Sequence, residues 1–145
     1  MNIFDGIYCN QYYELKKKGR EAEARKYGNA ILTIALVLNL LTIFLLLVGI
    51  FPDFADSAED LAKDVFGRSN GRSIGKVIGL IPFVVIYPIV RFIVGSEKRY
   101  DKIIERFKKY PDAEQEQISK KALRYFIISC TIIFIPIIIF LIKGM

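Results

Sequence analysis

Three apolar blocks separated by charged segments dominate the pattern along the chain. The first block, 30–51, contains no charged residue, and its few polar side chains form no stripe at the helical period. A helix of this length, at about 1.5 Å per residue, reaches roughly 33 Å and can cross a hydrocarbon core about 30 Å thick. The block therefore predicts a transmembrane helix.

The other two blocks differ in how clearly they predict a span. The third block, 125–142, is free of charge and rich in isoleucine, and it predicts a second span. The middle block, 74–95, contains the intramembrane charges Lys76 and Arg91, so its uninterrupted apolar stretch is also short enough for a re-entrant segment. Both charges lie near an end of the block, where long side chains can reach the headgroups. A full span is therefore the favoured interpretation.

Basic residues alternate in number between the segments outside these blocks. Segment 1–29 has six, segment 52–73 has three against five acidic residues, and segment 96–124 has nine. Because cytoplasmic loops are enriched in Lys and Arg, the alternation predicts three crossings, with 1–29 and 96–124 in the cytoplasm. Segment 52–73 and the tail 143–145 are then extracytoplasmic.

Short amphipathic helices are expected outside the bilayer. In 1–29, apolar residues recur every three or four positions beside a basic run, which is typical of an interfacial helix on anionic headgroups; a solvated charged helix fits nearly as well. The basic candidates for a lipid or partner surface are Lys16, Lys17, Lys18 and Arg20. In 52–73 a capping box predicts a helix at 57–66, whose carboxylates lack the spacing of a calcium loop.

The segment 96–124 predicts a basic cytoplasmic helical hairpin. Pro111 separates a first arm from a second arm that continues into the third span. Apolar residues of the first arm form one stripe, which we expect to be buried against the second arm, the lipid or a partner. With two adjacent lysines, this stripe completes the expected lipid or partner surface: Tyr100, Ile103, Ile104, Phe107, Lys108 and Lys109.

Small and polar residues within the spans predict how the helices pack. One side of the first span carries Ala35, Asn39, Thr42 and Gly49. We expect these residues to form an inward seam, with Asn39 hydrogen-bonded to a neighbouring helix. Gly75 and Gly79 form a G-x-x-x-G pair in the second span, which permits close packing within the chain or self-association.

Three prolines lie inside predicted spans, Pro82 and Pro88 in the second and Pro136 in the third. Each removes a backbone donor and displaces a carbonyl of the preceding turn, so we expect a kink at each position. Kinked helices act as gates in some transporters, but prolines are also frequent in ordinary membrane helices. No span carries a carboxylate or histidine that would couple transport to an ion gradient.

The composition argues against catalysis. The chain contains no histidine, which removes the usual base for a serine or cysteine nucleophile and a common metal ligand. The glycines of 71–77 lack the spacing and the hydroxyl residue of a phosphate-binding loop. Cys9 is expected in the cytosol and Cys130 in the bilayer, so they cannot pair. We therefore expect no enzymatic activity, no metal site and no cofactor.

Together these features predict an all-α membrane protein with three transmembrane helices, a cytoplasmic helical hairpin and short amphipathic helices outside the bilayer. The basic surface predicts contact with anionic headgroups and not with nucleic acid. The abundance of Ile, Lys and Phe is typical of an AT-rich bacterial genome, so we expect a bacterial inner membrane. The expected function is binding, as an accessory, scaffold or immunity-type component of a complex with another membrane protein or a second copy. The alternative is a small oligomeric channel or transporter, with a path lined by Asn39, Thr42, Tyr87 and Arg91.

Overall fold

The described residues form helices joined by short turns, and they contain no strand. The computed structural model describes all residues except 52, 54–55, 58–59, 61–62, 65–70 and 144–145, and it describes the backbone alone for 71–79 and 143. In chain order the elements are α1 (Ile3–Lys17), the 3-10 turn η1 (Glu21–Glu23), α2 (Ala24–Ile50), α4 (Gly71–Ile89), the π-helical turn η2 (Val90–Val94), α5 (Glu97–Lys108), α6 (Asp112–Ile132) and α7 (Phe134–Lys143). The expected all-α class is therefore confirmed. The described residues between 53 and 64 are also helical, but the predicted helix at 57–66 falls partly outside the described residues.

Two helices are long and apolar enough to cross a membrane, namely Glu21–Ile50 and Asp112–Ile142. A third candidate arises if Leu80–Val94 and Glu97–Lys108, which are bent by 62° relative to each other, count as one span. The middle block is thus the one that departs from a simple straight span. The chain therefore has two or three candidate spans. This confirms the prediction of a helical protein with candidate membrane spans and leaves their number at two or three.

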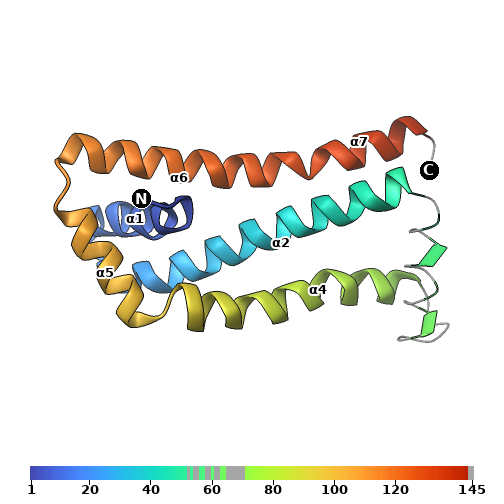
Figure 1. The fold of residues 1–145 in the computed structure, drawn as a ribbon, viewed down its shortest axis with the longest axis horizontal. Helices are drawn as coiled ribbons and strands as arrows, with labels where there is room; N and C mark the ends of the chain where they lie inside the picture. The colour runs from blue at the N-terminus through green and yellow to red at the C-terminus, as the bar shows by residue number, and fades with distance from the viewer. Residues whose placement is uncertain (52, 54–55, 58–59, 61–62, 65–70, 144–145) are drawn as a thin grey trace.

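The three long helical rods form an open layer with α2 in its centre. In Figure 1, α4 lies on one side of α2 and the α6–α7 rod on the other, so α4 and α6–α7 pack on α2 and are held apart by it. Both basic segments lie at one end of this layer, with α1, η1, α5 and the start of α6. The end of α2, the start of α4 and the end of α7 lie at the other.

Helix α1 is buried at the basic end, in the gap between α2, α5 and α6 (Figure 1). Its side chains Ile7, Tyr8, Cys9 and Leu15 are all at most 8% exposed. This corrects the expectation of an interfacial or solvated helix. Burying a large apolar side chain stabilises a fold by about 1.5–3 kcal/mol, so a stripe of this kind favours protein cover wherever the fold provides it.

A tight reversal sends the chain from α1 into α2. Gly19 has a φ of 68°, the left-handed conformation that glycine adopts without steric cost. The amide of Arg20 donates to the carbonyl of Leu15 at 2.9 Å, which closes the last turn of α1. Because the turn is short, α1 folds back onto the start of α2.

Helix α5 presents its apolar stripe to α1. Ile103, Ile104 and Phe107 are at most 6% exposed, and the Phe107 ring meets the Tyr12 ring edge to face, with centroids 6.3 Å apart. This corrects the expectation that the second arm, lipid or a partner covers the stripe. The predicted break at Pro111 does separate α5 from α6, but α1 lies between these two helices, so they do not pack as a simple hairpin.

Two of the three prolines, Pro88 and Pro136, lie close to local departures from α-helical geometry. Helix α6 ends at Ile132 and α7 begins at Phe134, so Pro136 lies in the first turn of α7 and cannot donate to the Ile132 carbonyl. Pro88 lies two residues before the π-helical turn η2, where the Gly95 amide donates to the Val90 carbonyl at 2.6 Å. Pro82 lies within α4, which continues through it.

Candidate functional site

The contact between α1 and α2 is built around a buried hydrogen bond. The Tyr8 hydroxyl donates to Asn29 Oδ1 at 2.8 Å, and both residues are at most 5% exposed. Two glycines leave room for this pair: a Cβ at Gly28 would lie 2.5 Å from the Tyr8 ring, and a Cβ at Gly95 would overlap Asn29 Oδ1. Desolvation raises the pKa of Tyr8 well above its usual value, so its hydroxyl remains a donor.

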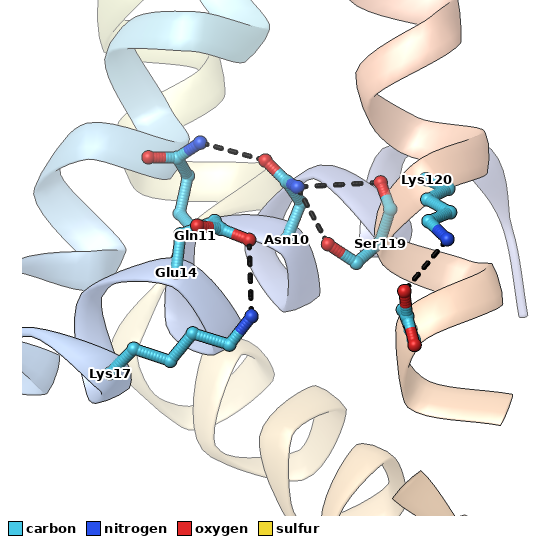
Figure 2. A network of polar contacts seen from close by, with 7 residues as sticks. Asn10, Gln11, Glu14, Lys17, Ser119 and Lys120 are labelled. Carbon is cyan, nitrogen blue, oxygen red and sulfur yellow. Dashed lines mark hydrogen bonds and ion pairs between the residues drawn. The ribbon is translucent and has the colours of Figure 1, made fainter. Parts of the chain in front are cut away.

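A second polar cluster joins α1 to α6. Figure 2 shows Asn10 Nδ2 donating to Ser119 Oγ at 2.7 Å, while Gln11 Nε2 donates to Asn10 Oδ1 at 2.9 Å. Close by, a Cβ at Gly6 would lie 3.3 Å from the Cβ of Ala122, so the two backbones approach closely. Buried amides and hydroxyls that satisfy one another in this way fix the register of a helix pair.

The predicted seam residues of α2 lie toward the α6–α7 rod. Asn39 Nδ2 donates to the Tyr125 hydroxyl at 3.0 Å, and a Cβ at Gly49 would lie 3.3 Å from the Phe140 ring. Ala35 is fully buried, and Thr42, 3% exposed, donates to the carbonyl one turn before it. Gly75 and Gly79 lie in the part of α4 whose side chains are outside the described residues, and so does Lys76.

An apolar groove runs between α2 and α4. It has a volume of about 440 Å³ and is lined by Leu40, Leu41, Ile43, Phe44, Leu47, Ile81 and Pro82. The groove opens outward, because Leu40 is 50% exposed and Ile43 is 58% exposed. These α2 residues belong to the middle of the first apolar block, so the groove faces whatever surrounds the candidate spans.

The basic end has a cationic surface over a closed apolar interior. Lys17 pairs with Glu14 at 3.8 Å and Arg20 with Glu23 at 2.7 Å, while Lys18 and Lys109 are exposed. Tyr100 is half-buried beside Tyr8, with ring centroids 5.9 Å apart. Of the predicted surface, the lysines and Arg20 are therefore accessible, whereas the apolar stripe belongs to the core.

Arg91 lies outside the packed interior. It is exposed on η2, and its guanidinium carbon lies 5.7 Å from the centroid of the Phe92 ring. A different arginine ties two of the helices together, since Arg99 of α5 donates to Asp5 of α1 at 3.4 Å. The 96–124 segment is thus held to α1 by charge as well as by apolar packing.

The two cysteines are free and unlike in their surroundings. Cys9 is fully buried in α1, and Cys130 is partly exposed on α6. Desolvation raises the pKa of the Cys9 thiol to about 12, so the thiol stays protonated and weakly reactive at neutral pH. Within the described part of the chain, no group of His, Cys, Asp or Glu side chains is arranged to hold a metal ion.

Sequence reasoning missed the residues that hold α1 in place. Asn10 lies on the apolar side of the N-terminal segment, and Asn29 directly precedes the first span; a polar residue at such a position is a signal for a buried hydrogen bond. Gly28 and Gly95 gave no comparable signal, because only the folded chain brings them to Tyr8 and Asn29.

The fold and these contacts define a class: an all-helical protein with two or three candidate membrane spans and a helix inserted into the basic end of its bundle. No protein-family model, curated protein or solved structure matches the chain.

The Tyr8–Asn29 bond gives a direct test of how α1 is held. Substituting Tyr8→Phe removes the donor and leaves Asn29 buried without it, which should lower the free energy of unfolding by about 1–3 kcal/mol. The measurement is chemical unfolding of the protein in mild detergent, followed by circular dichroism. Tyr110→Phe is the matched control, because Tyr110 is 37% exposed. Equal effects of the two substitutions would contradict the assigned role.

Proposed function

We propose that the chain is a three-span protein of the bacterial cytoplasmic (inner) membrane, with its N-terminus in the cytoplasm, that acts by binding. It serves as an accessory, scaffold or immunity-type component of a membrane complex. The observation that carries the proposal is the open layer of helices. Because α4 and α6–α7 lie on opposite sides of α2, one face of α2 and its groove with α4 stay uncovered by the chain.

The uncovered face has the form of a helix-docking surface. Leu40, Ile43, Leu47 and Ile50 recur at spacings of three and four along α2, and each is at least 37% exposed. In a bilayer, lipid covers such a surface as favourably as protein does, so helix association depends on shape and van der Waals packing. The groove beside Ile81 and Pro82 supplies that shape, and its occupant in this proposal is a transmembrane helix of another protein.

The charge distribution supports the proposed orientation. Segments 1–29 and 96–124 together carry fifteen basic and ten acidic residues, and they lie at the same end of the layer. Segment 52–73 follows α2 at the other end of the layer, away from these two segments, and it is net acidic. A basic end in the cytoplasm follows the general bias of membrane proteins.

The polar residues expected to line a transport path support binding over transport. The Asn39 amide donates to the Tyr125 hydroxyl, and the Thr42 hydroxyl donates to the backbone of its own helix. Both donors are therefore used within the helix bundle. Tyr87 stacks on Phe83 with centroids 6.0 Å apart, and Arg91 lies over Phe92. No observation in the described residues favours a path through them.

Site-specific photo-crosslinking tests the docking surface. A benzophenone amino acid in place of Ile43 should crosslink the full-length protein, in native membranes, to one different membrane protein. The same group in place of Ile128, which is 60% exposed on α6, is the matched control and should not. Ile43→Trp, which fills the groove, should reduce co-purification of that protein about tenfold, while Ile128→Trp should not, because groove packing depends on shape. Recovery of a homo-oligomer alone would contradict the proposal.

Topology is tested separately with single cysteines at two exposed positions. An impermeant maleimide applied to intact cells should label Asp60→Cys, on the extracytoplasmic side of the proposed topology. It should label Lys102→Cys only after permeabilisation. The unsubstituted chain measures the background from Cys9 and Cys130. Labelling of both introduced cysteines from outside would rule out the three-span arrangement.

A further inference from the structure

Two lysines from different helices converge on one aromatic ring at the basic end. Lys16 lies in the last turn of α1 and Lys108 in the last turn of α5, and their Nζ atoms are 5.9 Å and 5.3 Å from the centroid of the Tyr12 ring. The two ammonium groups are therefore no farther apart than the sum of these distances. Tyr12 is only 7% exposed and packs edge to face on Phe107, so the ring has a fixed position.

These two lysines differ from several of their basic neighbours, which are paired. Lys17 pairs with Glu14, Lys120 with Glu116 and Arg99 with Asp5. Among the residues that the structure describes, no carboxylate lies within ion-pair distance of Lys16 or Lys108. Each cation is stabilised separately by the dipole at the C-terminal end of its helix and by the Tyr12 ring. Neither the helix ends nor the ring supplies a full negative charge, so an anion that contacts both ammonium groups would add an attraction that these surroundings lack.

The position of the pair along the bundle distinguishes between two classes of anion. Lys108 lies just before α6 begins, and the third apolar block starts at Tyr125, thirteen residues into that helix. In the proposed topology this separation is about 20 Å along the helix axis. The headgroup layer of one leaflet is only about 5–8 Å thick. The pair therefore projects beyond the lipid phosphates into the aqueous phase.

We propose that Lys16, Tyr12 and Lys108 form a docking site for an acidic segment of the partner protein. Two carboxylates of that segment bind the two ammonium groups, which both lie near the Tyr12 ring. The inference rests on the proposed function, and it names the chemistry that the basic end recognises. Anchoring the partner outside the bilayer complements the α2–α4 groove, where apolar packing alone gives little discrimination.

The test measures binding of a fluorescein-labelled octaglutamate peptide to the full-length protein in phosphatidylcholine nanodiscs, by fluorescence anisotropy at low salt. Lys16→Gln with Lys108→Gln should weaken binding about tenfold or more, since charge-assisted hydrogen bonds are lost. The matched control, Lys98→Gln with Lys121→Gln, removes the same charge at the same end and should change affinity less than about twofold. Equal unfolding midpoints establish that both double variants are folded.

Three results would overturn the inference. Equal weakening by the two double variants would assign binding to the diffuse basic surface, and no binding of octaglutamate to the unsubstituted protein would remove the site. Peptide binding could also be lost when the nanodiscs contain phosphatidylglycerol in place of phosphatidylcholine. If that loss depends on Lys16 and Lys108, the pair binds lipid headgroups instead. Failure of the Ile43 crosslink would contradict the proposed function but would leave peptide binding intact, so the two failures are distinguishable.

Discussion

Helix α1 has an apolar stripe that must be covered, and its burial between α2, α5 and α6 organises the whole basic end of the molecule. Tyr8 reaches Asn29 of α2, Asn10 reaches Ser119 of α6, and Tyr12 meets Phe107 of α5. One short helix thereby contacts three others, through two hydrogen bonds and one aromatic pair. Because these side chains are buried, removing a hydrogen-bond partner leaves an unpaired polar group, and removing a ring leaves a cavity inside the core.

The burial of α1 has consequences for both ends of the bundle. By filling the gap between α2 and α6, α1 keeps the long helices apart at the basic end and holds α5 across it (Figure 1). Farther along, α2 alone separates α4 from α6–α7, which leaves the groove at Leu40 and Ile43 open. Among the described residues, the accessible features of this layer include an apolar groove and a cationic surface. The proposed binding function rests on these two features.

Patterns within a short window predicted much of this fold. Charge-free blocks predicted the long helices α2 and α6–α7. The single amide in the first block predicted a hydrogen bond from Asn39 to a neighbouring helix, and its partner is Tyr125 of α6. Amphipathic spacing predicted that α1 and α5 are helices. It did not predict which helices pack on their apolar stripes, because that depends on the tertiary structure. The same limit applies to Gly95, whose small size matters only beside Asn29. The pairing of Lys16 with Lys108 around Tyr12 joins segments far apart in sequence, so no local pattern could predict it.

Disulfide trapping tests the central claim, that α1 lies inside the bundle, most directly. The Cβ positions of residues 6 and 122 are 3.3 Å apart, close to the spacing of about 3.5–4.5 Å that a disulfide requires. Mild oxidation of Gly6→Cys with Ala122→Cys in native membranes should therefore crosslink α1 to α6 within one chain, as read by mass spectrometry of proteolytic fragments. Gly6→Cys with Leu123→Cys is the control, because Leu123 is 47% exposed. No crosslink at 6–122, or an equal yield from both pairs, would contradict the inserted position of α1.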